Sequence, residues 1–139
     1  MNVIIVGCGR VGSALAYQLY EKHFQVTVVD HRSYAFEKLH PEFQGRVVEG
    51  DCLTENTLRR AGIENAEALA AVTDSDSINI VIAHVARDIY RVPKVVLRNY
   101  DPDWQPVYAA FGLPIVGSAS LEVQRMDELL SGVESRQDG

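Results

Sequence analysis

Residues 3–30 read VIIVGCGRVGSALAYQLYEKHFQVTVVD, and this stretch decides the fold. An apolar run over residues 3–6 predicts a β-strand. Glycines at positions 7, 9 and 12 follow directly in a GxGxxG frame, and residues 11–23 carry apolar side chains at helical spacing. A second β-branched run then ends in Asp30. The stretch therefore predicts a strand, a tight glycine turn, a helix and a second strand.

A glycine turn between a strand and a helix is a suitable site for phosphate groups. Gly7 permits the tight turn, Gly9 lets the backbone approach a pyrophosphate without a Cβ in the way, and Gly12 lets the helix pack closely on the strand. The helix N-terminus offers free N–H groups and the positive end of its dipole. Asp30, at the end of the next strand, can accept hydrogen bonds from ribose hydroxyls. The pattern predicts a bound dinucleotide or adenine nucleotide.

The charges beside the turn bear on which nucleotide binds. Arg10 lies inside the turn, where it either adds a positive charge to the phosphates or is a solvated surface arginine. The charge of Asp30 repels a 2′-phosphate, so NAD(H) or a plain adenine nucleotide is favoured over NADP(H). Arg32 counts against this preference, because a nearby arginine can accommodate a 2′-phosphate. Val11 and His31 adjoin these residues and belong to the same candidate site.

The rest of the chain continues the alternation of strands and helices. Strands are predicted at residues 25–29, 46–49, 69–72, 94–97 and 114–116. Helices are predicted at residues 33–39, 54–61, 75–90 and 102–111, the last one starting at Asp101 and Pro102. Because the strand runs are apolar nearly throughout, we expect helices to cover both faces of the sheet. Right-handed crossovers then give an α/β, doubly wound parallel sheet, a Rossmann fold with strand order 3-2-1-4-5-6.

Further polar residues follow the third and fourth predicted strands. In open α/β sheets ligands bind at this carboxyl edge. Asp51 is placed to meet an adenine edge, and the small side chain of Cys52 leaves space beside it. Thr73 and Asp74 end the fourth strand next to the glycine turn, and Asn79 falls one turn into the following helix.

Composition excludes several other classes of protein. The 139 residues, 47% of them hydrophobic, suffice for one domain with a sizeable core. The net charge of −6 and the scattered basic residues disfavour a nucleic-acid partner. No apolar run is long enough to cross a bilayer, and Cys8 and Cys52 lack the spacing of a disulfide framework or a metal site. We expect a cytoplasmic domain without a metal and without direct membrane insertion.

The segments GCGRVG, VTVVD, VVEGDCLTENTLRRAGIENAEALAAVTDSDSINI and VVLRNYDPD together resemble the N-terminal nucleotide-binding domain of potassium conductance and potassium uptake regulators, the RCK or KTN family. The resemblance covers residues 3–116. It implies a cytoplasmic, usually dimeric domain that binds NAD(H) or ATP, ADP or AMP and acts on a membrane potassium channel or transporter subunit. Attachment to the inner membrane through that partner is part of the same expectation. The positions that match the family's ligand site are Gly7, Gly9, Arg10, Val11 and Gly12 at the phosphates, Asp30 at the ribose, Asp51 and Cys52 at the adenine, and Thr73, Asp74, Asn79 and Arg98 around the rest of the ligand.

The resemblance also implies a division of the chain. Residues 1–117 match the nucleotide-binding domain, and residues 118–139 match a C-terminal amphipathic helix and tail. Apolar residues at helical spacing predict a helix over 119–133, which either packs back on its own domain or meets a partner. Its resemblance to the family's crossover helix implies that it meets a partner subunit, in a homodimer or higher homo-oligomer. The family's usual alanine is replaced by Cys52, and the C-terminal lobe that often follows such domains does not follow in this sequence.

The sequence offers little catalytic machinery. Tyr34 and Lys38 form a YxxxK pair like that of short-chain dehydrogenases, but it follows the second strand and not the fifth. The chain has no GxSxG elbow, no metal-binding histidine pair and no P-loop. We therefore expect no catalytic residue. A small NAD(P)-dependent oxidoreductase or epimerase stays as the alternative, followed by a Rossmann fold that has lost its ligand and serves as a dimerisation scaffold.

Overall fold

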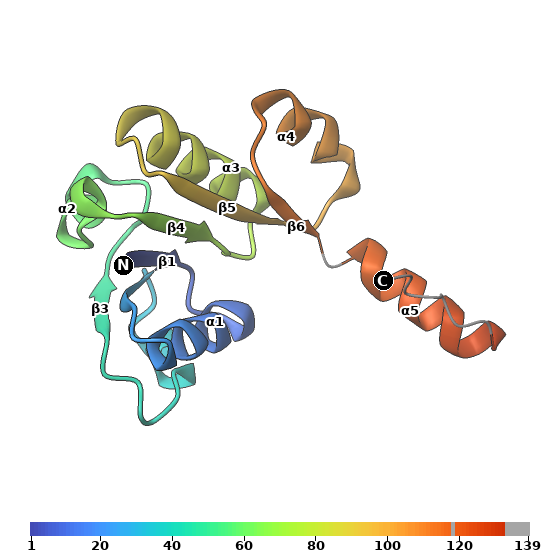
Figure 1. The fold of residues 1–139 in the computed structure, drawn as a ribbon, viewed down its shortest axis with the longest axis horizontal. Coiled ribbons are helices and arrows are strands. Elements are labelled where there is room, and N and C mark those ends of the chain that lie inside the picture. The colour runs from blue at the N-terminus through green and yellow to red at the C-terminus, as the bar shows by residue number, and fades with distance from the viewer. Residues whose placement is uncertain (118, 133–139) are drawn as a thin grey trace.

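A parallel sheet with strand order β3-β2-β1-β4-β5-β6 forms the centre of the molecule (Figure 1). The computed structural model describes residues 1–117 and 119–132 of the chain. The strands are β1 (Asn2–Val6), β2 (Gln25–Asp30), β3 (Arg46–Glu49), β4 (Ala68–Ala71), β5 (Lys94–Asn99) and β6 (Ile115–Gly117). This confirms the predicted doubly wound α/β fold, including its strand order.

Helices lie on both sides of the sheet. They are α1 (Arg10–Glu21), η1 (Ser33–Lys38), α2 (Glu55–Arg60), η2 (Ile63–Asn65), α3 (Asp76–His84), η3 (Val85–Ile89), η4 (Pro102–Trp104), α4 (Gln105–Phe111) and α5 (Ala119–Ser131). In Figure 1, α1 lies on one side of the strands and α3 and α4 lie on the other. Right-handed crossovers require this arrangement, because the direction of strand addition reverses between β3 and β4. The reversal places the topological switch point between β1 and β4, and in open α/β sheets ligands bind there at the carboxyl edge.

Three predicted helices contain 3-10 or π turns in the structure. Residues 33–39 were expected to be an α-helix, but η1 is a 3-10 helix that ends before the His40-Pro41 pair, where α conformation is disfavoured. Residues 75–90 form α3 and then the single π-turn η3. The helix predicted at residues 102–111 begins as the 3-10 turn η4. The N–H of Asp103 donates to Asp101 Oδ1 at 2.9 Å, which confirms the predicted cap at Asp101.

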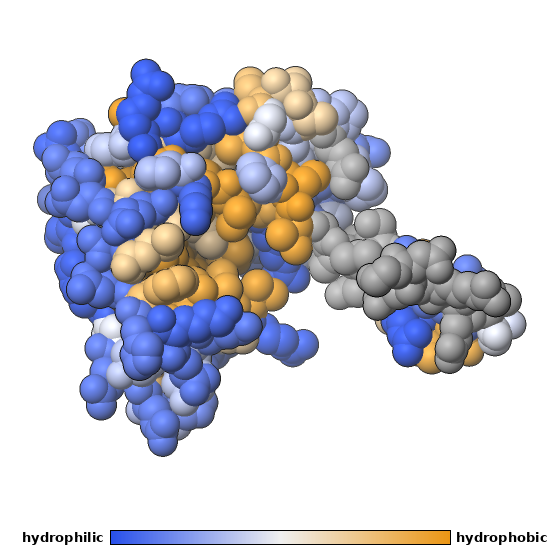
Figure 2. All heavy atoms as spheres, viewed as in Figure 1, coloured by the Kyte–Doolittle hydropathy of each residue, from blue (hydrophilic) through white to orange (hydrophobic). Residues whose placement is uncertain are grey.

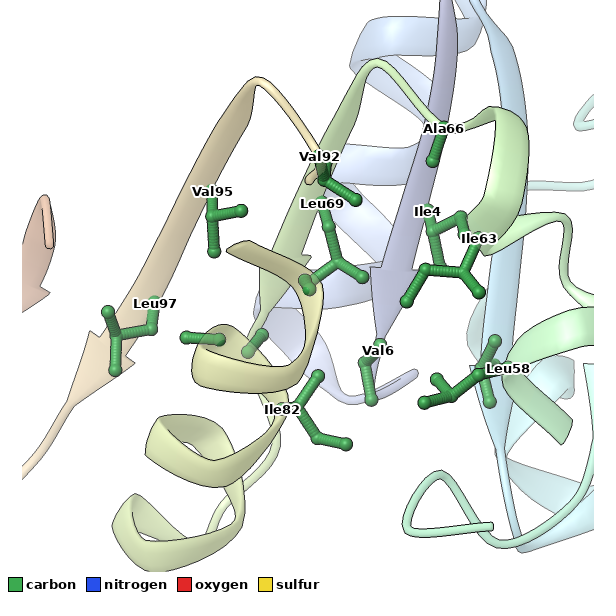
Figure 3. Packing of buried hydrophobic residues seen from close by; sticks show 14 of the residues in the cluster. Ile4, Val6, Leu58, Ile63, Ala66, Leu69, Ile82, Val92, Val95 and Leu97 are labelled. Carbon is green, nitrogen blue, oxygen red and sulfur yellow. The ribbon is translucent and has the colours of Figure 1, made fainter. Parts of the chain in front are cut away.

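Alternate side chains of the strands build two separate cores. Ile4 and Val6 of β1 point toward α2 and α3, where they meet Leu58 and Ile82 (Figure 3). Ile5 points to the opposite face and packs in the cluster under α1. Period-two alternation in β1 thus buries both of its faces, as expected of a central strand.

Burial on both faces does not extend to the outer strands, so that expectation was wrong for β3 and β5. In β3 the side chains of Arg46, Val47 and Glu49 are exposed, because β3 is an edge strand with few helical contacts. In β5 burial alternates, and Val96 is 38% exposed on the face that α1 does not reach. Figure 2 shows apolar side chains gathered over the strands between α1 and α3.

The C-terminal helix α5 extends away from the sheet (Figure 1). It confirms the predicted helix from residue 119 to Ser131; Gly132 follows the helix, and position 133 lies outside the described residues. Its apolar side chains Val123, Met126, Leu129 and Leu130 are each at least 63% exposed. Within residues 1–117 and 119–132, no helix has both the length and the apolar character to cross a bilayer.

Candidate functional site

The glycine turn between β1 and α1 is held against two other strands. The N–H of Gly7 donates to Val29 O at 2.8 Å, which ties the turn to β2. Gly7 has a φ of +110°, and a Cβ at this position would lie 2.9 Å from the backbone of Val72 and Thr73 after β4. A Cβ on Gly12 would lie 1.8 Å from Gly7 O. Gly7 and Gly12 therefore allow turn, helix and neighbouring strand to touch through backbone alone.

Gly9 has a different environment. Among the described residues, no heavy atom apart from its chain neighbours lies within 4 Å of a Cβ built on Gly9. Gly9 is also the N-cap of α1, and having no side chain it leaves the first N–H groups of the helix to an outside partner. Arg10 and Val11 follow and are exposed beside this opening. The space is suited to an anion at the positive end of the helix dipole.

Asp30 lies at the end of β2, next to the turn, and its side chain is nearly fully buried. Its Oδ2 accepts the N–H of Cys8 at 2.9 Å, and its Oδ1 accepts the N–H of Arg32 at 2.9 Å. Burial alone would raise the pKa of this carboxyl. Hydrogen bonds from the Arg32 guanidinium and from the N–H groups of Cys8 and Arg32 outweigh burial and lower the pKa of Asp30. The carboxylate is therefore fixed in position and ionised at neutral pH.

The two residues after Asp30 differ in their relation to it. Arg32 Nε lies 3.1 Å from Asp30 Oδ1, and Arg32 Nη2 lies 3.3 Å from Asp30 Oδ2. The His31 side chain is 72% exposed, and its Nδ1 is 3.7 Å from Asp30 Oδ1, beyond hydrogen-bond distance. Arg32 is thus part of the local structure of the site, whereas His31 lies at its surface.

The loop after β3 adds Asp51 and Cys52. The N–H of Gly50 donates to Asp30 O at 3.0 Å, so this loop starts beside the β2 end. Asp51 is exposed, and its Oδ1 accepts the N–H of Leu53 at 2.9 Å in a local turn. Burial raises the pKa of Cys52 to about 11, with a further contribution from the charge of Asp51. Cys52 is therefore a neutral thiol that packs beside the core at neutral pH.

Cys8 lies within the glycine turn and is fully buried. Burial raises the pKa of its thiol to about 11, and the charge of Asp30 adds to this effect. A thiolate at this helix N-terminus is thus disfavoured. Cys8 fills space in the core under α1.

Asn79 connects the ends of β4 and β5. Its Oδ1 accepts the hydroxyl and the N–H of Thr73 at 2.6 and 2.9 Å. Its Nδ2 donates to Thr73 O and to Arg98 O at 3.1 and 3.0 Å. Asn79 is completely buried, so we infer that it holds the Thr73 loop in position from the protein interior and does not contact a ligand itself. Asp74, the next residue in that loop, is exposed.

Arg98 lies near the end of β5 on the face that α1 leaves open. Its guanidinium carbon is 4.1 Å from the centroid of the Tyr100 ring, within the range of a cation–π contact. Asp76, at the start of α3, accepts the N–H groups of Tyr100 and Asp101 at 2.7 and 2.8 Å. Tyr100 and Asp76 were not among the predicted site residues. Tyr100 could have been found from its i+2 spacing to Arg98, directly after the end of β5.

Contacts between these loops link the ends of five strands. Cys8 in the β1 turn bonds Asp30 of β2, Gly50 after β3 bonds Asp30 O, and the N–H of Val72 after β4 donates to Val6 O of β1. Asn79 completes the series by bonding the backbone of Thr73 and of β5. The predicted residues therefore converge on the carboxyl edge around the switch point of the sheet. Tyr34 of the YxxxK pair is 63% exposed on η1, and its ring centroid lies 5.9 Å from the guanidinium carbon of Arg32.

Comparison with known proteins agrees with this geometry. The TrkA-N domain family matches residues 3–118 of the chain. The Trk system potassium uptake protein TrkA of Streptomyces coelicolor is 43% identical over 126 residues, which are 91% of this chain and 56% of that protein. The match to the TrkA of Halomonas elongata, at 37% identity, covers 70% of this chain and 21% of that protein. The chain thus spans about half or less of the length of these curated relatives.

Solved structures of GsuK have the same fold. The GsuK RCK domain has a TM-score of 0.80 and 29% identity, covering 96% of this chain and 29% of that one. The GsuK channel bound to NAD has a TM-score of 0.78 and 28% identity, covering 94% of this chain and 23% of that one. GsuK bound to ADP has a TM-score of 0.79 and 28% identity, covering 96% and 34%. The glycine turn, the acid at the end of β2 and the match over most of its length together show that the chain belongs to the TrkA-N domain family.

Proposed function

We propose that the chain is a nucleotide-sensing regulatory domain of a potassium uptake system or potassium channel. The observation that carries the proposal is the open space before Gly9 at the N-terminus of α1, with the ionised carboxylate of Asp30 beside it. A phosphate group at the helix and ribose hydroxyls at Asp30 satisfy both features. NAD and ADP, the ligands named for the GsuK structures, each contain a phosphate group and ribose hydroxyls within an adenosine diphosphate moiety. We therefore propose NAD(H), ATP, ADP or AMP as ligands.

The remaining predicted residues have roles in this proposal. Arg10 and Val11 lie beside the phosphates, and Asp51 and Cys52 lie on the adenine side, where the β3 loop adjoins Asp30. Arg98 contributes positive charge at the other side of the turn. Asn79 acts through Thr73, since its own polar atoms are engaged within the chain. Asp74 is the exposed acid that faces the ligand from the β4 loop.

The proposed role is signalling and not catalysis. A ligand changes the state of an attached transporter only through different affinities for two conformations of the domain. The site supplies groups that bind a nucleotide. We assign none of its residues as an acid, base or nucleophile in a reaction. In this proposal the domain works in the cytoplasm, held at the inner membrane by its transport partner.

A melting experiment tests the nucleotide proposal. NADH, NAD, NADPH, ATP, ADP and AMP are added singly to the purified chain, and the melting temperature is recorded. A ligand that binds only the folded chain stabilises it by about 2.7 kcal/mol at a concentration of 100 times its Kd. We expect an upward shift with NADH, NAD or an adenine nucleotide. If none of the six ligands shifts the melting temperature at millimolar concentration, the proposal is refuted.

We further propose that α5 (Ala119–Ser131) mediates a homodimer, separately from the nucleotide-binding domain of residues 1–117. The exposed apolar side chains of α5 have a complement in Val96 and Val116, which are exposed on the open face of β5 and β6. Exposed apolar area of this kind is typical of a surface that a partner covers. A second copy of the chain supplies both surfaces at once.

The oligomeric state tests the role of α5. We expect a dimer by light scattering at micromolar concentration. Leu129→Asp places a charge in the apolar face and should give a monomer, while Gln124→Ala, exposed on the opposite side of the same helix, should leave the dimer intact. A wild-type chain that stays monomeric at high micromolar concentration would contradict this assignment.

A further inference from the structure

The carboxylate of Asp30 already has a full set of hydrogen-bond donors from its own chain. Oδ1 accepts the backbone N–H and the Nε–H of Arg32 at 2.9 and 3.1 Å. Oδ2 accepts the backbone N–H of Cys8 and the Nη2–H of Arg32 at 2.9 and 3.3 Å. A carboxylate offers about four lone-pair positions, two on each oxygen. A ribose hydroxyl can therefore bond Asp30 only after one of these donors leaves.

The two backbone donors cannot leave without rebuilding the site. The N–H of Cys8 belongs to the glycine turn, and the N–H of Arg32 belongs to the chain that connects β2 to η1. The guanidinium of Arg32 can leave, because its long side chain is 32% exposed. Its departure frees one position on each carboxylate oxygen. Two ribose hydroxyls, at C2′ and C3′, are the matching pair of donors.

The guanidinium also has other contacts near the site. Its central carbon lies 5.9 Å from the centroid of the exposed Tyr34 ring. The hydrogen bond with Asp30, the charge of Asp30 and, more weakly, the charge of Asp74 raise the pKa of Arg32. When displaced from Asp30, the guanidinium thus has an aromatic ring and a second acid as neighbours. It stays beside the ribose and keeps its charge.

We propose that Arg32 is a specificity-determining residue that occupies the ribose-binding carboxylate in the unliganded chain and is exchanged for the ribose diol when a nucleotide binds. This inference rests on the proposed nucleotide function. Two consequences follow for ligand choice. Ligands with a free diol bind more weakly than they would if Asp30 were unoccupied, because they must displace the Arg32 guanidinium. A ligand with a 2′-phosphate gains the displaced cation as a partner, so Arg32 narrows the preference for NAD(H) over NADP(H).

Titration of the Arg32→Met chain with NADH, ADP and NADPH tests the exchange. Methionine retains an unbranched apolar stem and removes every donor. We expect the affinities for NADH and ADP to rise roughly tenfold, the equivalent of one charge-assisted hydrogen bond. The ratio of the NADPH dissociation constant to that of NADH should rise by at least roughly tenfold, because the partner of the 2′-phosphate is gone. Arg32→Lys, a point charge that cannot bond both oxygens at once, should give a smaller gain for NADH.

Two controls separate this exchange from a general effect of charge. Arg59→Met removes the same charge from the exposed face of α2 and should leave all three affinities unchanged. A 2′,3′-dideoxy analogue of ADP lacks the diol, so its affinity should not rise in the Arg32→Met chain. Circular dichroism confirms that each variant is folded before titration.

The outcomes distinguish this inference from the nucleotide proposal. If the wild-type chain binds NADH and ADP, and Arg32→Met binds them equally or more weakly, the exchange is refuted and the nucleotide site stands. A gain that extends equally to the dideoxy analogue also refutes it. Binding by Arg32→Met alone would refute nucleotide sensing by the wild-type chain and would show only that Arg32 blocks Asp30. If neither chain binds any nucleotide, both proposals fall.

Discussion

Replacing Gly12 with alanine is expected to lower the free energy of unfolding by more than about 3 kcal/mol. The added Cβ would lie 1.8 Å from Gly7 O and 3.3 Å from a methyl group of Val72. The first contact is with backbone, so no rotamer change relieves it. The start of α1 must then move away from the sheet, and the turn loses its contact with β4. Urea denaturation at neutral pH, monitored by circular dichroism, measures the loss.

Gly9→Ala is the matched control for this effect. It adds the same methyl group in the same turn, where the described residues leave the space open and where φ is −90° and ψ is −158°, an extended conformation open to alanine. Because alanine is a poorer N-cap than glycine, we expect its stability to lie within about 1 kcal/mol of wild type, well above that of Gly12→Ala. Equal stability of the Gly12→Ala and Gly9→Ala chains would show that the close approach of α1 to the turn is not required for folding.

Asp30→Asn is expected to cost about 3 kcal/mol of folding stability and to abolish nucleotide binding. The amide keeps one acceptor oxygen but places an NH₂ group against an N–H donor, either that of Cys8 or that of Arg32. It also leaves the Arg32 guanidinium without its ionic partner. The ribose diol loses one of its two acceptors for the same reason. Unfolding in urea and titration with NADH measure the two effects separately.

The pH dependence of the stability identifies the carboxylate as the cause. The pKa of Asp30 is lower in the folded chain than its ordinary value of about 3.9. Its contribution is therefore complete above that value and is lost as the pH falls through the folded pKa. The difference between wild type and Asp30→Asn should be constant from about pH 5 to 8 and shrink below about pH 4. A difference that persists unchanged into strong acid would refute this explanation.

Asp51→Asn provides a comparison at the same edge of the sheet. Asp51 is exposed, and its carboxylate accepts a single local N–H, that of Leu53, at 2.9 Å. Asparagine can accept the same hydrogen bond. We expect a change in stability within about 0.5 kcal/mol, which would show that the effect at Asp30 comes from its buried position.

The sequence predicted the fold because its pattern is local. The GxGxxG turn and the alternation of apolar runs with helical spacing determine strand order once crossovers are right-handed. Burial of the outer strands could not be predicted in the same way. Val96 and Val116 look like core residues in the sequence, and their exposure depends on which face the helices cover. That depends on the direction of strand addition and not on the residues themselves.

For the candidate site, the sequence predicted where the residues lie better than it predicted what each of them contacts. Asp30 and Asn79 were both expected beside a ligand, and both lie at the carboxyl edge. The sequence could not show that Asn79 is saturated by Thr73 and the β5 backbone, since these partners lie in other elements. Nor could it show that Arg32 covers both oxygens of Asp30. Hydrogen-bond saturation is a three-dimensional property that residue spacing does not encode.

Calorimetric titration of the wild-type and Gly9→Ala chains with NADH, NAD, ATP, ADP and AMP tests the central claim most directly, that an adenine nucleotide lies over the glycine turn. We predict binding to the wild-type chain with at least one of the five ligands. The same ligand should bind at least roughly tenfold more weakly to Gly9→Ala, although this chain is still folded at the titration temperature, because the new methyl group occupies the phosphate position. No binding to the wild-type chain at concentrations on the order of 1 mM, or equal affinity of the two chains, would contradict the account.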